Sequence, residues 1–163
     1  VFSLVTQVIG RGGRAEYPGR AIIQTVSPGH PVLQLAARQD YEAFFEEEIG
    51  FRQLCLYPPF CDLCMVGFSG EKEGPALAAA ARFSAILAEL ARRDWPRMPL
   101  RVLGPAPMNV AMVKDLYRFK LTIKCRNTHD FRALMRAVLA RYGEEGLPAR
   151  ASVTLDFNAD GDL

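Results

Sequence analysis

Residues 129–142 carry the most regular hydrophobic pattern of the chain. Their apolar side chains occupy positions i, i+3, i+4, i+7, i+8 and i+11: Phe131, Leu134, Met135, Val138, Leu139 and Tyr142. This spacing places all of them on one side of a helix. Thr128 is a suitable N-cap before the segment, and Gly143 is a suitable C-terminal stop after it. The pattern therefore predicts an amphipathic helix over residues 129–142.

Two further segments alternate between apolar and polar residues, which is the period of a β-strand. Residues 151–157 should turn these side chains inward: Ala151, Val153, Leu155 and Phe157. Residues 117–124 should turn one set inward, Tyr117, Phe119, Leu121 and Ile123, and the other outward, Arg118, Lys120, Thr122 and Lys124. Residues 61–69 are apolar on both faces, which is typical of a central strand.

One more helix and two more strands are predicted between residues 73 and 114. An alanine-rich helix is expected from Glu73 to Arg93, with Leu77, Phe83, Leu87 and Leu90 near one side. A strand over residues 100–103 is expected to break at 104–107, and residues 109–114 should form a hairpin with 117–124. The order is β-α-β-β-α-β, which predicts a ferredoxin-like α+β domain with both helices on one face of an antiparallel sheet. The opposite face is left to water or to a partner.

The first third of the chain follows a different pattern. Helices are expected over residues 1–9, 31–39 and 40–54, with one short strand over 21–26 that is rich in β-branched residues. A single strand cannot form a sheet, so residues 1–56 are expected to be the tail of a larger lobe. The rigid Tyr57-Pro58-Pro59 segment marks the boundary with a second domain, residues 57–163.

Composition limits the classes of function only weakly. Half of the residues are hydrophobic and 23% are charged, which suits a folded core, and no apolar run approaches the ~18 residues of a membrane span. The net charge of +2 is too small to argue for nucleic-acid binding by itself. Four irregularly spaced cysteines are expected to remain reduced in the cytoplasm.

A glycine-rich basic segment follows the first predicted helix. It contains Gln7, Gly10, Arg11, Gly13 and Arg14. Arginine guanidinium groups match phosphate oxygens with paired hydrogen bonds, and glycines allow close approach of the backbone. From these residues alone, a phosphate-contacting loop and a solvated basic turn are both open.

This segment resembles motif VI of superfamily-two helicases, whose form is Gln-x-x-Gly-Arg-x-Gly-Arg. The chain as a whole resembles the C-terminal part of the PriA family of bacterial primosomal helicases. The match continues through residues 56–60, 102–107 and 116–119. Ile9 and Gly12 depart from the small alanines usual in the family, and Asn158-Ala159 departs from its usual Asp-Pro.

The resemblance implies the end of a RecA-like helicase lobe and an ATP-dependent 3′-to-5′ DNA helicase of replication restart and primosome assembly. Arg11 and Arg14 would contact the γ-phosphate of ATP, Gln7 would orient water, and Gly10 and Gly13 would shape the loop. ATP and magnesium would be the cofactors. Forked DNA, the acidic tail of single-stranded DNA-binding protein and other primosome proteins would be the partners, with no membrane involved. The alternative is a ferredoxin-like module that binds protein or nucleic acid without a catalytic role.

Two other groups of residues suggest binding. Arg118, Lys120 and Lys124 should project from one exposed sheet face, where they could track DNA phosphates or simply be solvated. Cys61 and Cys64 have zinc-like spacing, but no set of four ligands accompanies them, so no metal is expected. The zinc that the family carries belongs to a cysteine-rich insertion upstream of motif VI.

The sequence generates one prediction about nucleotide binding. It contains no Gly-x-x-x-x-Gly-Lys-[Ser/Thr] loop to hold phosphates. The chain by itself should therefore neither bind nor hydrolyse ATP appreciably. Calorimetric titration with ATP and magnesium measures this directly, and an affinity in the micromolar range would contradict it.

Overall fold

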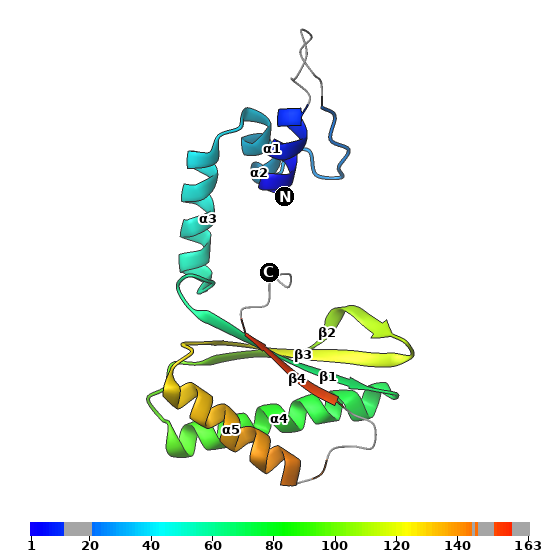
Figure 1. The fold of residues 1–163 in the computed structure, drawn as a ribbon, viewed down its shortest axis with the longest axis vertical. Helices are drawn as coiled ribbons and strands as arrows, with labels where there is room; N and C mark the ends of the chain where they lie inside the picture. The colour runs from blue at the N-terminus through cyan, green and yellow to red at the C-terminus, as the bar shows by residue number, and fades with distance from the viewer. Residues whose placement is uncertain (12–20, 145, 147–151, 158–163) are drawn as a thin grey trace. The chain divides into compact units, whose positions relative to one another are not determined.

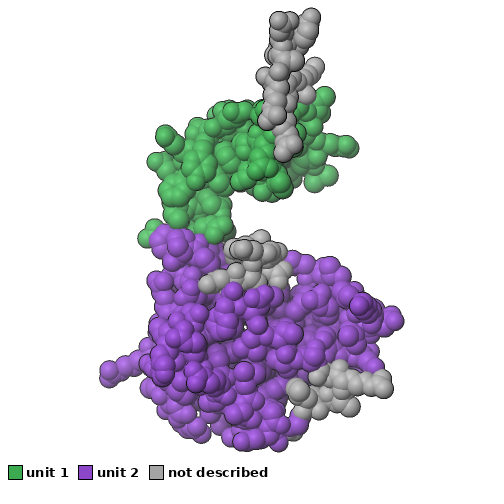
Figure 2. All heavy atoms as spheres, in the orientation of Figure 1, with its two compact units in different colours: residues 1–55 green, residues 56–163 purple. Residues whose placement is uncertain are grey.

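A computed structural model describes residues 1–11, 21–144, 146 and 152–157 of the chain. The chain forms two compact units, residues 1–55 and residues 56–163, which are distinguished by colour in Figure 2. Each unit has its own packing and is described separately.

The first unit contains three helices: α1 (Phe2–Arg11), α2 (Pro31–Arg38) and α3 (Tyr41–Cys55). His30 caps α2, because its Nδ1 accepts a hydrogen bond of 3.3 Å from the Val32 N–H. The strand predicted for residues 21–26 is wrong, since this segment has no regular secondary structure. A strand needs a neighbour to satisfy its backbone groups, and the described part of this unit offers none.

The first unit buries little apolar surface among its described residues. Phe2 stacks on Phe44 with ring centroids 4.3 Å apart, and Tyr41 contacts Phe2 edge-on. No residue of α3 is buried, and Phe45 and Leu54 on that helix are exposed. The unit therefore has a small aromatic cluster and leaves much of its apolar surface uncovered.

The second unit contains a four-stranded sheet and two helices. Its elements are β1 (Asp62–Gly70), α4 (Glu73–Asp94), β2 (Arg101–Val113), β3 (Leu116–Cys125), α5 (His129–Glu144) and β4 (Ser152–Phe157). The strands lie in the order β2-β3-β1-β4, and each neighbouring pair is antiparallel. Figure 1 shows both helices on the same face of this sheet. The predicted α+β class and the β-α-β-β-α-β order are confirmed.

The strand β2 differs from its prediction. Residues 100–103 and 109–114 were expected as separate strands, but one strand runs over Arg101–Val113 with irregular register against β3. Gly104 permits this irregularity, because its φ of 103° suits glycine and a Cβ there would lie 2.7 Å from the Lys120 carbonyl oxygen. The Gly-Pro-Ala-Pro segment therefore distorts the strand without ending it.

The core lies between the sheet and the two helices. Phe83 of α4 is fully buried and contacts Phe68 and Tyr142, with ring centroids 5.5 and 5.3 Å away. The Tyr142 hydroxyl donates a 3.2 Å hydrogen bond to the Ala79 carbonyl oxygen. The predicted stripe of α5 is buried except for Leu139, which is partly exposed.

The buried side of helix α4 does not include every apolar residue that the sequence placed there. Its buried residues include Ala76, Ala79 and Ala80, whereas Leu77 is 40% exposed. Small alanines allow the helix to approach the sheet closely. Within the described residues, α4 is also the one helix long and apolar enough to span a membrane by length and composition, but here its apolar side packs in the core.

The aromatic core predicts that two substitutions on α4 lower the free energy of unfolding by different amounts. Phe83→Ala should lower the free energy of unfolding by about 3–5 kcal/mol, because it leaves a cavity between Phe68 and Tyr142. Leu77→Ala on the same helix should cost much less, since Leu77 is partly solvated. Urea unfolding followed by circular dichroism compares the two. Equal losses would mean that this cluster does not form the core.

Candidate nucleic-acid interface

The face of the sheet opposite α4 and α5 is called the open face here. Residues directly paired across strands share a face. The β1–β3 and β1–β4 registers therefore assign these side chains to the open face: Leu63, Met65, Ser69, Arg118, Lys120, Thr122, Lys124, Ser152, Thr154 and Asp156. Arg101 of β2 joins them, because it pairs with Lys124. The predicted row of Arg118, Lys120 and Lys124 thus lies on one face, as the alternation indicated.

The predicted exposure of that row is wrong. Lys124 is only 7% exposed, and Arg118 and Lys120 are half-buried. The Lys124 ammonium lies 3.7 Å from the centroid of the Tyr57 ring, in a cation–π contact. Alternation within a strand determines the face of a side chain, but it does not reveal which distant segment covers that face. Lys124 therefore has a structural role that the sequence did not indicate.

The centre of the open face is closely packed around Gly67. A Cβ at this position would lie 2.6 Å from Thr154 Oγ1 and 2.7 Å from Met108 Cε. Met108 and Thr154 therefore approach the Gly67 backbone as no larger residue would allow. The open face thus combines cations and the carboxylate of Asp156 with hydroxyl groups and an apolar centre, rather than being uniformly basic.

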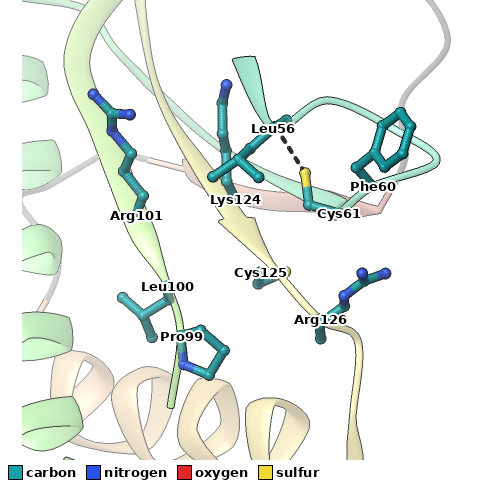
Figure 3. Close-up of a pocket in the computed structure, with 9 residues that line it drawn as sticks. All are labelled: Leu56, Phe60, Cys61, Pro99, Leu100, Arg101, Lys124, Cys125 and Arg126. Atoms are coloured by element: carbon teal, nitrogen blue, oxygen red, sulfur yellow. Dashed lines mark hydrogen bonds between the residues drawn. The ribbon is translucent and has the colours of Figure 1, made fainter. Parts of the chain in front are cut away.

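A pocket of about 290 Å³ lies at one end of the sheet. Its lining residues are Leu56, Phe60, Cys61, Pro99, Leu100, Arg101, Lys124, Cys125 and Arg126. Figure 3 shows Arg101 on β2, Lys124 on β3 and Arg126 just after β3, with Leu56, Phe60 and Cys61 on the segment before β1. The Cys61 thiol donates a 3.0 Å hydrogen bond to the Leu56 carbonyl oxygen within that segment.

The thiols near this end of the sheet are held in their protonated form. Burial raises the pKa of Cys64 to about 12, with a smaller contribution from Asp156. Burial also raises the pKa of Cys125 to about 12, and it raises the pKa of Cys61 despite the opposing charge of Lys124. Within the described ranges, no group of three or more His, Cys, Asp or Glu side chains is placed to hold a metal ion. These cysteines therefore contribute to packing.

The helicase-like motif is described only in part. Gln7 and Gly10 are exposed on α1, and Arg11 is the last residue of that helix. The helix thus continues two residues beyond its predicted end at residue 9. Gly13 and Arg14 lie outside the described residues, so their roles and that of Arg11 stay predictions.

Sequence reasoning missed the pocket residues Phe60 and Arg126. Arg126 directly follows a predicted strand, and Phe60 follows the two prolines that mark the boundary. Both features were visible, but nothing in the sequence indicated that the two residues line the same pocket.

The sequence comparisons place the chain in a family. The family described as the primosomal protein N C-terminal domain matches residues 53–159. Because this match covers most of the chain, the chain belongs to that family and corresponds to a C-terminal part of PriA proteins.

Relatives named replication restart protein PriA extend the match into the first unit. The Bacillus subtilis protein is 34% identical over 157 residues, covering 96% of this chain and 19% of the relative. The Chlamydia pneumoniae protein is 40% identical, covering 76% of the chain and 16% of the relative. The Synechocystis protein is 32% identical, with 76% and 14% covered. The chain thus spans less than a fifth of the length of these relatives.

A comparison with solved structures adds no argument about function. A hydantoinase/carbamoylase family amidase from Burkholderia ambifaria aligns with a TM-score of 0.41 and 13% identity, covering 60% of this chain and 27% of that one.

The contact between Lys124 and Tyr57 generates a prediction about stability. Lys124→Met and Tyr57→Leu should each lower the free energy of unfolding, and the double variant should show a coupling of about 0.5–2 kcal/mol. Lys120→Met provides the control, because its combination with Tyr57→Leu should be additive. Urea unfolding of the full set tests this, and additivity of the Lys124 and Tyr57 changes would contradict the contact.

Proposed function

We propose that this chain is the C-terminal part of an ATP-dependent 3′-to-5′ DNA helicase that acts in replication restart and primosome assembly. The observation that carries the proposal is the family match over residues 53–159, joined to a motif-VI pattern at residues 7–14. In this proposal residues 1–55 end the second RecA-like lobe, and residues 56–163 form a ferredoxin-like platform. The protein works in the cytoplasm.

The proposed catalytic contribution comes from the basic segment after α1. Arg11 and Arg14 neutralise charge on the γ-phosphate during hydrolysis, as arginine fingers do in related nucleotide hydrolases. Gln7 orients the attacking water, while Gly10 and Gly13 let the backbone approach the phosphates. Residues elsewhere in the longer protein would hold the magnesium ion, which would neutralise charge on the phosphates. The chain thus supplies one side of an ATPase site and no complete one.

The proposed binding contribution comes from the second unit. Arg101, Arg118 and Lys120 share the open face, so together they offer positive charge to the phosphates of forked DNA. The acidic tail of single-stranded DNA-binding protein and other primosome proteins are the proposed protein partners, since acidic segments are attracted by the same cations. Contacts of Arg118 and Lys120 with phosphates would position the DNA without reading its sequence.

The proposal predicts a specific kinetic loss in the longer helicase that contains this chain. Arg14→Ala should lower kcat for DNA-stimulated ATP hydrolysis by roughly 10³-fold or more, with little change in nucleotide affinity. Arg38→Ala is the matched control, because Arg38 is an exposed arginine of α2 in the same unit. Steady-state ATPase assays with nucleotide titration separate the two effects. Equal losses in both variants, or a parallel loss of affinity, would contradict the arginine-finger role.

A further inference from the structure

The pocket at the end of the sheet combines three positive charges. Arg101, Lys124 and Arg126 line it, and among the described residues neither Asp nor Glu does. The neighbouring Asp62 is engaged with the backbone, because its Oδ2 accepts a 2.8 Å hydrogen bond from the Asn127 N–H. The Lys124 ammonium faces the Tyr57 ring, whereas Arg101 and Arg126 are exposed. Figure 3 shows the two guanidinium groups at opposite sides of the pocket, so an anionic group bound here would lie between positive charges.

The rest of the pocket lining is apolar. Leu56, Phe60, Pro99 and Leu100 contribute the hydrocarbon surface, and the neutral Cys61 and Cys125 thiols complete it. Phe60 is partly exposed and is the one aromatic residue among the described residues of the lining. The volume of about 290 Å³ lies at the small end of ligand pockets. The chemistry therefore suits one small unit that carries both an anionic group and a flat apolar group.

The position of the pocket favours a polyanion over an isolated anion. Arg101 pairs with Lys124 across β2 and β3, and Lys120 and Arg118 continue along β3 on the same face. Residues two apart on a strand are separated by about 6.6 Å, so the cations extend from the pocket along the open face. A chain of phosphates could follow this line and place its last unit in the pocket. A single peptide carboxylate would occupy the pocket alone, whereas a chain of phosphates would also meet Lys120 and Arg118.

We propose that this pocket binds one nucleotide of a single DNA strand that lies on the open face. Arg101 and Arg126, on opposite sides of the pocket, supply positive charge for the phosphates of this nucleotide, and the base packs against Phe60. Stacking on an aromatic side chain combined with a basic track is a general mode of single-strand binding. The inference rests on the DNA-binding part of the proposed function and assigns that part a definite site.

The test compares two ligands of equal charge with the complete 163-residue chain. Fluorescence anisotropy measures binding of a short oligothymidylate and of an abasic oligomer with the same number of phosphates. The wild-type chain should prefer oligothymidylate by about 5- to 100-fold, the range expected for stacking of one base. Phe60→Ala should abolish this preference and leave the salt dependence unchanged, and Phe60→Leu should abolish most of it while preserving the apolar contact.

The cations of the pocket should affect the salt dependence of binding rather than the preference for a base. Arg126→Ala should weaken both oligomers equally and lower the slope of log K against log salt by about one. Arg136→Ala, an exposed arginine on α5, is the charge-matched control and should leave that slope unchanged. Circular dichroism melting of each variant verifies that the fold is intact.

Three other results would contradict the assignment of a nucleotide to this pocket. Equal binding of the two oligomers by the wild-type chain, or a preference that survives Phe60→Ala, would overturn the pocket assignment while leaving DNA binding intact. If neither oligomer binds at low salt, the DNA-binding part of the proposed function fails as well. Binding of an acidic peptide with a free carboxyl end, lost in Arg126→Ala while the base preference is absent, would assign the pocket to a protein partner instead.

Discussion

The pairing of β1 with β3 is the constraint on which the rest of the second unit depends. Val66 lies opposite Leu121 and Phe68 lies opposite Phe119, and all four side chains are buried beneath α4 and α5. A shift of one residue in this register would turn Lys120 toward the helices and Leu121 toward the open face. Burial of the apolar side therefore fixes which face carries the cations.

The same register also determines which of those cations is buried. It places Lys124 at the end of the sheet, where its ammonium meets the Tyr57 ring instead of solvent. Lys124 thus helps to attach the segment before β1. Arg101 lies beside Lys124 on the neighbouring strand β2, and Arg126 follows Lys124 by two residues after the end of β3, so the pairing of β2 with β3 brings the pocket cations together.

Sequence patterns predicted the elements whose apolar residues follow one period. The helix over 129–142 and the strands at 117–124 and 151–157 were predicted because burial on one side requires a regular period. The strand at 61–69 was predicted because its residues are apolar on both faces. The predicted strand at 21–26 was wrong because propensity cannot supply a neighbouring strand. Gly104 and Pro105 suggested a break where the structure keeps one irregular strand.

The sequence predicted only those features of the candidate site that follow from the alternation of apolar and polar residues along a strand. Arg118 and Lys120 were assigned to the correct face, but burial of Lys124 arises from Tyr57, which is far away in the sequence. Phe60 and Arg126 likewise come together only through folding. The motif at Gln7–Arg14 was identified by its residue types, and its contact with a nucleotide stays a prediction.

In the function we propose, DNA phosphates contact the open face specifically and are not attracted by the net positive charge of the molecule alone. The most direct measurement is the salt dependence of forked-DNA binding by two double variants with equal charge. Arg118→Ala with Lys120→Ala removes two cations from the open face, and Arg92→Ala with Arg136→Ala removes two exposed arginines from α4 and α5. The first pair should lower the slope of log K against log salt by up to about two, and the second should leave it unchanged. Equal changes in both pairs, or none in the first, would contradict the account.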